Sequence, residues 1–397
     1  MKSFFTPKRI YLDYAAATPV RREVLSAMEP FFSHDFGNPS AIHTEGVIAK
    51  RALETARTEL ARTLRVRPSE VFFTGSGTES NNLAIVGYMR QLEASGTPLD
   101  QLEVLTTAIE HPSILEPLRA LEKEGLTVHY CSLDDEGKIN MPEFRSLFSV
   151  RTALVTFAYS NSEIGVVQDV KTISRQVRKF NQAHKTNIVI HLDAAQAPLW
   201  LPCQCDALGV DMMSLDAGKC GGPKGVGVLV KKSNIELKGV IRGGGQEDGL
   251  RAGTENVPLC VGASKAIVLA QQEREAAATR TTMLRDGMIS QLLELDGVVL
   301  NGPQTQRIAN NINVSVLGFD AEFAVISLDA VGIAAATQSA CSGQKGGGSA
   351  VVRVITGDEA RASSTVRFSL GPQTSKRDVA RAVLKLREHI QHMSKSL

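Results

Sequence analysis

The chain has 397 residues, 43% of them hydrophobic, and a formal net charge of +2. This length exceeds what one compact core usually covers, so we expect two domains, or one large domain with an appendage. The nearly balanced charge, with Lys and Arg spread along the chain, gives no electrostatic basis for direct nucleic-acid binding. The N-terminal residues lack the apolar core of a signal peptide, and no apolar run is long enough to span a membrane. We therefore expect a cytoplasmic protein with no membrane contact.

The cysteines do not form the dense framework of a small secreted domain. They are spread along the chain as Cys131, Cys203, Cys205, Cys220, Cys260 and Cys341. Cys203 and Cys205 lie close together, but no second Cys or His pair follows at zinc-binding spacing, so we expect no metal site. Most of these thiols are expected to be buried packing residues.

Up to about residue 260, short apolar runs alternate with helical patterns. Strands are predicted at residues 70–75, 103–108, 152–159, 187–194 and 225–232. Helices are predicted at residues 42–64 and 173–184. This alternation is typical of an α/β fold in which helices cover a mostly parallel sheet.

After residue 260 the pattern changes. Residues 262–295 are free of proline and rich in helix formers, which predicts a long helix leading from the large domain to a smaller α+β domain. The glycine-rich stretch at 342–350 predicts a mobile loop. Ser375 and Asp378 have the spacing of a helix cap and predict a final helix, since apolar residues recur after them at helical spacing.

The stretch "FFTGSGTESNN" combines the end of a strand, a glycine-rich turn and the start of a helix near Thr78. Free backbone N–H groups and the positive end of the helix would then face one point, which is an anion site. The alternative is an ordinary capped helix after a tight turn. The stretch is not a Walker loop, because no Lys-Ser or Lys-Thr pair follows the glycines.

A carboxylate and a lysine follow in chain order. Asp193 ends the predicted strand in "VIHLDAAQ", where open α/β sheets place their ligands, although a helix cap or a surface ion pair is the commoner use of one Asp. Lys219 precedes the turn "GGPKG", and Lys224 lies within that turn and is expected to face solvent. A phosphate cup, a carboxylate and a lysine in this order fit pyridoxal phosphate. Lys219 would form its Schiff base and Asp193 would pair with its pyridinium nitrogen.

Motifs spread over nearly the whole chain resemble those of the cysteine desulfurases, which are pyridoxal-phosphate enzymes of the class V aminotransferases and of fold type I. The motifs are "YLDYAAATPV", "FGNPSAIH", "GTESNNLAI", "IEHPSIL", "NSEIGVVQDV", "HLDAAQ", "GKCGGPKGVG", "GGGQEDGLRAGTEN", "QSAC" and "SSTVRFSLG".

The resemblance implies a domain division. Residues 15–262 would form a large cofactor-binding domain with a mostly parallel mixed sheet. Residues 1–14 and 263–397 would form the small α+β domain, which carries a mobile catalytic cysteine loop at about 339–362.

The resemblance also implies roles around the cofactor ring. Lys219 would hold pyridoxal 5'-phosphate covalently and shuttle the substrate's α-proton. His111 would stack on the ring and assist proton transfer. Asp193 would bind the ring nitrogen, and Gln196 would hydrogen-bond the phenolic oxygen.

Further roles concern the phosphate and the substrate. Gly77 and Thr78 would cup the phosphate, and Thr254 would reach the phosphate of a partner subunit, which implies a homodimer. Arg367 would clamp the carboxylate of the substrate through a bidentate pair, with Asn38 nearby.

Cys341 would be the nucleophile of a sulfurtransferase reaction. Its thiolate would take the sulfur of L-cysteine as a persulfide, with release of L-alanine. The sulfur would then pass to an acceptor protein, either a scaffold for iron–sulfur cluster assembly or a relay for thio-cofactor or tRNA biosynthesis. Without the surrounding motifs, a surface thiol on a loop is the preferred interpretation of Cys341.

Three positions depart from the family pattern in the cofactor pocket. Ser162 stands where a second Asn is usual beside the ring. Asp216 replaces a Ser or Thr hydroxyl that donates to the phosphate, and Gly218 replaces a His. A carboxylate facing a phosphate is repulsive unless it is protonated or turned away. A closer backbone N–H at Gly218 would partly replace the lost donor.

Three functions therefore remain open at this point. The first is a working cysteine desulfurase with a remodelled phosphate cup. The second is a selenocysteine lyase, or another pyridoxal-phosphate lyase or aminotransferase. The third is a catalytically impaired paralogue that acts as a scaffold.

Overall fold

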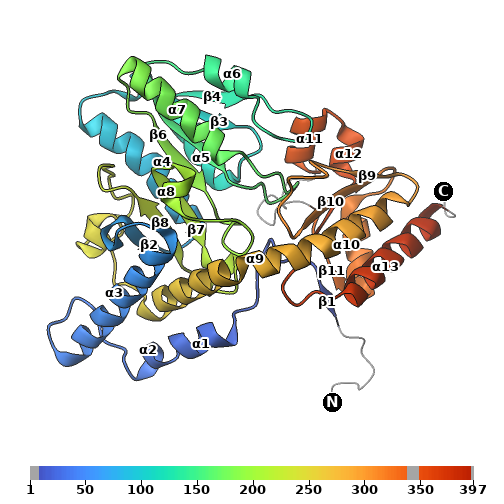
Figure 1. The fold of residues 1–397 in the computed structure, drawn as a ribbon, viewed down its shortest axis with the longest axis horizontal. Coiled ribbons are helices and arrows are strands. Elements are labelled where there is room, and N and C mark those ends of the chain that lie inside the picture. Colours follow the sequence, from blue (N-terminus) through green and yellow to red (C-terminus); the bar gives the residue numbers. More distant parts are fainter. Residues whose placement is uncertain (1–8, 338–347, 395–397) are drawn as a thin grey trace.

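The structure is a computed structural model that describes residues 9–337 and 348–394. At its centre lies a seven-stranded sheet in the order β2-β8-β7-β6-β5-β3-β4 (Figure 1). Its strands are β2 (Val71–Thr74), β3 (Glu103–Thr107), β4 (Thr127–Cys131), β5 (Thr152–Ala158), β6 (Val189–Asp193), β7 (Met212–Asp216) and β8 (Gly227–Lys231). Strand β8 pairs antiparallel with both of its neighbours, whereas the remaining pairs are parallel. The predicted α/β fold with a mostly parallel mixed sheet is confirmed.

Helices cover both faces of this sheet, because successive side chains of each strand point to opposite sides. Phe72 and Leu229 belong to one apolar cluster, whereas Phe73 and Val228 belong to the other. The first cluster is completed by α4 (Gly77–Ala94) and α5 (Pro112–Glu122). The second is completed by α3 (Thr44–Leu64), α7 (Val170–His184) and the first half of α9 (Val257–Leu293).

A third apolar cluster surrounds a three-stranded antiparallel sheet in the order β12-β10-β9. The second half of α9 packs on this sheet, so the long helix joins the two parts of the molecule (Figure 1). The short strand β1 (Ile10–Tyr11) also joins this part, because it pairs in parallel with β11 (Ile333–Ala334). The other elements here are β9 (Val298–Leu300), β10 (Asn311–Val316), α10 (Ala321–Ala330), α11 (Ala350–Thr356), α12 (Glu359–Ser363), β12 (Thr365–Ser369) and α13 (Lys376–Ser394).

Short helices complete the described chain. They are α1 (Arg22–Met28), α2 (Pro30–Ser33), α6 (Met141–Ser146), α8 (Cys205–Leu208) and the 3-10 turns η1 (Pro68–Glu70), η2 (Leu99–Gln101), η3 (Ala217–Lys219) and η4 (Gln246–Gly249). Within the described ranges, no helix combines the length and apolar content that crossing a bilayer requires.

The element predictions can now be compared with the fold. All of the predicted strands and helices are present, with ends shifted by up to five residues. The predicted cap of the last helix is confirmed, because Ser375 Oγ accepts the N–H of Asp378 while Asp378 Oδ2 accepts the N–H of Ser375. Most of the glycine-rich stretch predicted to be mobile lies outside the described residues. Its last three residues lie inside them, and Ser349 caps α11.

Candidate active site

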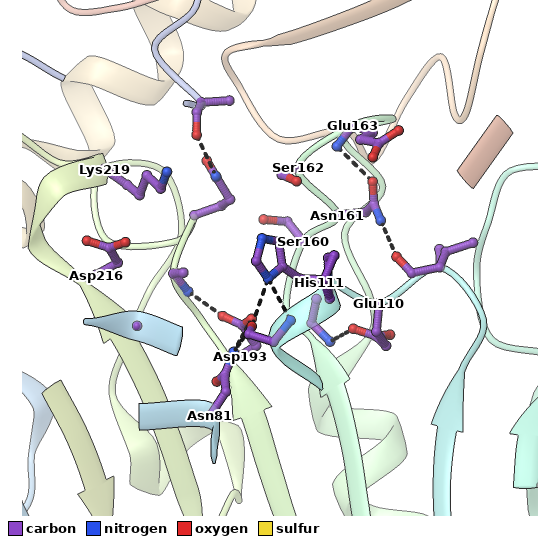
Figure 2. Close-up of a pocket in the computed structure, with 18 of the residues that line it drawn as sticks. Asn81, Glu110, His111, Ser160, Asn161, Ser162, Glu163, Asp193, Asp216 and Lys219 are labelled. Carbon is purple, nitrogen blue, oxygen red and sulfur yellow. Dashed lines mark hydrogen bonds between the residues drawn. The ribbon is translucent and has the colours of Figure 1, made fainter. Parts of the chain in front are cut away.

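A cavity of about 260 Å³ opens at the carboxyl ends of β5, β6 and β7 (Figure 2). Among the residues that sequence reasoning selected, the cavity brings together Gly77, Thr78, His111, Ser162, Asp193, Gln196, Asp216, Lys219 and Arg367. Gly218 lies between two of these residues and is buried. Asn38 and Thr254 do not line the cavity and are exposed on this chain. Cys341 lies outside the described residues.

Asp193 is the last residue of β6, a central strand, and this position delivers its carboxylate to the floor of the cavity. The residue is only 8% exposed. Its oxygens accept hydrogen bonds from Asn81 Nδ2 and from the N–H of Ala195, both at 2.9 Å. Within the described chain no cation pairs with it, so the cavity presents a buried carboxylate that suits a positively charged ligand atom.

Asn81 was not singled out from the sequence, although it lies within the quoted motif "GTESNNLAI". It lies one helical turn after Gly77 on α4, so both face the same cavity. Its amide nitrogen donates to Asp193 and to Ser113 Oγ. Its Oδ1 atom is buried and has no hydrogen-bond partner within the described part of the chain. An unpartnered buried oxygen of this kind indicates a place where a ligand donor or a water molecule belongs.

Lys219 lies in η3, directly after β7, where the chain turns back into the antiparallel strand β8. Its side chain points into the cavity (Figure 2), and Nζ donates to the carbonyl oxygen of Ala16. Lys224, in contrast, is exposed in a bend beyond the cavity. The predicted solvent exposure of Lys224 is therefore confirmed, and Lys219 is the lysine that a ligand in the cavity would meet.

His111 caps the N-terminus of α5, and its Nδ1 atom accepts the N–H of Ser113 at 3.1 Å. The pKa of the His111 ring is lowered, chiefly by burial, although Asp193 opposes the shift and Lys219 adds to it. A lowered pKa favours the neutral ring near pH 7. Because Nδ1 is an acceptor, the neutral ring carries its proton on Nε2.

Glu110 is a further lining residue that was not singled out from the sequence. It accepts hydrogen bonds from Thr107 Oγ1 at 2.6 Å and from the N–H of Ala158 at 2.8 Å. Burial nevertheless raises its pKa to about 8, and those two hydrogen bonds only partly oppose the shift. Its carboxyl group is therefore largely protonated near pH 7.

Arg367 reaches the cavity from β12, in the second sheet, and its side chain is only 1% exposed. One terminal nitrogen donates to Asp13 Oδ1 at 2.8 Å, and the other donates to the carbonyl oxygen of Ser162 at 3.2 Å. Its Nε atom has no partner among the described residues. The guanidinium is thus held in place but keeps unused donor capacity, which suits a carboxylate ligand.

Asp216 lies opposite the first turn of α4. A Cβ atom placed on Gly77 would lie 3.3 Å from Asp216 Cβ and 3.6 Å from Asp216 Oδ2. Its other oxygen, Oδ1, accepts the N–H of Gly218 at 2.9 Å. Burial raises the pKa of Asp216, whereas Lys219 and the Gly218 N–H lower it by less. The carboxyl group is therefore not turned away from the helix N-terminus that was predicted to bind an anion.

A mostly parallel sheet whose carboxyl ends carry this lysine, aspartate and histidine agrees with the family model "Aminotransferase class-V", which matches residues 10–382. The chain belongs to the class V aminotransferases. It is 38% identical to the "Cysteine desulfurase IscS" of Dictyoglomus turgidum, over 94% of this chain and 92% of that protein. Within the family, the chain is a member of the cysteine desulfurases.

Solved structures agree with this placement. A "NifS-like protein" with 32% sequence identity superposes with a TM-score of 0.89, covering 97% of this chain and all of that one. The structure titled "SspA in complex with cysteine" has 33% identity and a TM-score of 0.77, covering 92% of this chain and all of that one. The family resemblance and the fold class predicted from the sequence are both confirmed.

Proposed function

We propose that this protein converts L-cysteine to L-alanine with pyridoxal 5'-phosphate and transfers the sulfur, as a persulfide on Cys341, to an acceptor protein. The observation that carries the proposal is the cavity itself. It joins a lysine amine, a buried carboxylate without a cationic partner and an arginine with unused donors, namely Lys219, Asp193 and Arg367. The relative titled as a complex with cysteine supports the choice of substrate.

The residues present fit this cofactor at its ring. Lys219 offers an amine for the covalent link, and Asp193 offers a carboxylate for the ring nitrogen. The unpartnered Oδ1 of Asn81 leaves an acceptor beside that carboxylate. Gly77 and Thr78 open α4, so their N–H groups have no acceptor within the helix and suit the phosphate.

When bound, pyridoxal phosphate supplies an electron-withdrawing ring that stabilises negative charge on the substrate's Cα. The chain does the rest. Asp193, held by two N–H donors, keeps a proton on the ring nitrogen. Nζ of Lys219 takes the proton from the substrate's Cα and returns one to the product. The neutral ring of His111 covers one face of the site and carries a proton on Nε2. Gln196 Nε2 donates one hydrogen to Ala15 O at 2.9 Å, and its second N–H would hydrogen-bond the phenolic oxygen.

Arg367 binds the substrate's carboxylate in this proposal, and Ser162 occupies the space beside the ring. The persulfide forms when the Cys341 thiolate attacks the sulfur of the bound substrate. The substrate's Cβ–S bond breaks, and its electron pair stays on the carbon fragment, which becomes L-alanine after protonation. Cys341 lies outside the described residues, so this role is inferred from the family motif "QSAC" alone. The acceptor is a scaffold for iron–sulfur cluster assembly or a relay for thio-cofactor or tRNA biosynthesis.

We further propose that the chain acts as a cytoplasmic homodimer divided into domains at 15–262 and at 1–14 with 263–397. The described cysteines are all free and buried, which suits a reducing compartment. The exposure of Thr254 and Asn38 supports the dimer, since a partner subunit would cover them and Thr254 would complete the partner's phosphate site.

The test compares three variants by visible absorption and by sulfide release from cysteine with a reductant. Lys219→Ala is expected to lose the absorption band of lysine-bound cofactor, because no other amine lines the cavity among the described residues. The matched control Lys224→Ala keeps the band, since Lys224 is exposed. Cys341→Ser keeps the band but releases no sulfide.

Three other results would contradict the proposal. Equal loss of the band in both lysine variants would remove Lys219 from its role. Full turnover by Cys341→Ser, with cysteine or selenocysteine, would favour a lyase that does not use this thiol. A wild-type protein that stays colourless after the cofactor is added would favour the scaffold.

A further inference from the structure

The phosphate end of the cavity contains a carboxyl group where a hydroxyl donor is usual. Asp216 Oδ2 lies beside Gly77, at the first turn of α4, and Thr78 continues that turn. The same cavity is lined by Gly77, Thr78, Asp216 and Lys219. A phosphate bound at this turn would therefore contact Asp216.

Gly218 fixes Asp216 in this position. Its N–H donates to Asp216 Oδ1, and a Cβ atom at position 218 would lie only 3.2 Å from that oxygen. A larger residue at 218 would therefore crowd the carboxyl group. The two departures from the family pattern, at 216 and 218, are compatible with each other and leave Oδ2 as the atom directed to the helix.

The charged groups that face Asp216 come from three elements. They are Lys219 of η3, Asp193 of β6 and His111 at the start of α5. The amine of Lys219 is the only cation among them near pH 7, because the His111 ring is neutral and Asp193 adds a negative charge. In the proposed reaction that amine is bonded to the cofactor, so it cannot also neutralise two anionic groups at the phosphate end.

We infer that Asp216 and the phosphate of the cofactor share one proton, so that the protein takes up a proton when it binds pyridoxal phosphate. The inference rests on the proposed function. Above about pH 7 the free phosphate is a dianion. Before the cofactor binds, the Lys219 amine and the Gly218 N–H favour the ionised form of Asp216 against the effect of burial. Binding then combines the two anions with one proton from solvent. The product is an O–H···O⁻ hydrogen bond in which Asp216 Oδ2 is one of the two oxygens.

The test measures the dissociation constants of pyridoxal phosphate and of pyridoxal, which lacks the phosphate, by absorption titration of the apoprotein. Both compounds react with Lys219, so the titration of that amine cancels in their ratio. One linked proton predicts that the preference for the phosphorylated compound falls about tenfold for each pH unit above about pH 7. A ratio that does not change with pH in the wild-type protein would overturn the inference.

Two variants locate the proton. Asp216→Asn and Asp216→Ser cannot share a proton but can donate to the phosphate, so the ratio becomes independent of pH. At about pH 8.5 both bind pyridoxal phosphate about tenfold more tightly than the wild type. Asp135→Asn, which makes the same chemical change at an exposed position, retains the wild-type dependence. Equal dependence in Asp216→Asn and the wild type would also overturn the inference.

The result can be separated from failure of the proposed function. Sulfide release is measured separately at saturating cofactor. If the protein releases sulfide but binds the cofactor without the pH dependence, the proposed function stands and the inference is wrong. If the protein binds neither compound at any pH, both the proposed function and the inference are wrong.

Discussion

Glu110 shows how strongly a single buried residue can couple this fold to pH. It is buried, and the described residues provide it with one hydroxyl and one backbone N–H as donors. A carboxylate needs more donors than this to remain charged in such a place. The neutral, protonated form is therefore part of the folded structure near pH 7, two residues from Pro112, which starts α5.

Glu110→Gln is expected to remove a pH dependence of stability. Below about pH 4.5 the wild-type group is protonated in both the folded and the unfolded chain. Between about 4.5 and about 8 only the folded chain keeps the proton, so rising pH lowers the free energy of unfolding. The loss is at most about 1.4 kcal/mol for each pH unit. Glutamine cannot ionise, so the free energy of unfolding of the variant increases relative to that of the wild type as the pH rises.

Urea unfolding at about pH 5 and about pH 8 would measure this difference. The control is Glu116→Gln on the same helix, whose side chain is 65% exposed. If Glu110→Gln and the wild type lose stability equally over this range, Glu110 is ionised in the folded protein.

The site residues were only partly predictable. Lys219, Asp193 and the turn before Thr78 could be selected because strands and turns set their positions along the chain. Asp13, Asn81 and Glu110 could not, although all three lie within quoted motifs. Their significance depends on partners far away in the sequence, such as Arg367 for Asp13, and a single sequence contains no information about such distances.

At the scale of elements, a buried ion pair connects α3, η4 and the edge strand β2. Arg57 of α3 forms two hydrogen bonds with Glu247 of η4, at 2.7 and 2.9 Å. Glu247 Oε2 also accepts the N–H of Phe73, and Arg57 donates to the carbonyl oxygen of Val71. The two side chains thus bind each other and also form hydrogen bonds with backbone groups of β2.

The same arginine allows a matched comparison, because it contacts a second carboxylate at the surface. The side chain of Glu247 is 1% exposed, whereas that of Glu54 is 51% exposed. Glu247→Gln is expected to lower the free energy of unfolding by about 3 kcal/mol, since the mostly buried Arg57 charge loses its buried carboxylate and keeps only the exposed one. Glu54→Gln is expected to lower it by about 0.5 kcal/mol or less. Urea unfolding of both variants checks the difference, and similar losses would mean that the buried pair contributes no more than the surface pair.

Elements differed in how well their sequences predicted them. Strands β5 and β6 are mostly apolar, and they were predicted. Strands β10 and β12 were not, because Asn313 and Arg367 interrupt their apolar patterns. Both residues are buried, yet each donates to a backbone carbonyl oxygen in the segment Ser162–Glu163. When polar residues of a strand have such tertiary partners, the pattern of hydrophobicity does not predict the strand.

At the scale of the whole molecule, large apolar side chains are exposed around α1, α2 and the start of α3. Phe36 is 67% exposed and Ile42 is 98% exposed. Nearby, Pro39 and Ser40 line a cavity together with residues 245–248 and Glu255, next to Thr254. Exposed apolar side chains beside a residue proposed to complete a neighbouring site support the homodimer.

Ile42→Asp is therefore expected to shift the protein toward monomers in sedimentation velocity at micromolar concentration. A carboxylate placed in a buried interface costs several kcal/mol. The variant should also bind pyridoxal phosphate more weakly, because each monomer loses the Thr254 of its partner. Ile326→Asp on α10 is the control, since Ile326 is 65% exposed in the other part of the molecule. A dimer that survives Ile42→Asp would place the interface elsewhere.

The N-terminal segment that closes the cavity has a consequence for protein synthesis. Ile10 pairs with Ile333, and Asp13 contacts Arg367, 354 residues away in the chain. A ribosome therefore releases this segment long before its partners. The seven-stranded sheet is complete by Lys231 and can fold while translation continues, as domains generally do. The wall that holds Arg367 cannot form until β12 has emerged, so a nascent chain carries Lys219 in an open half-site.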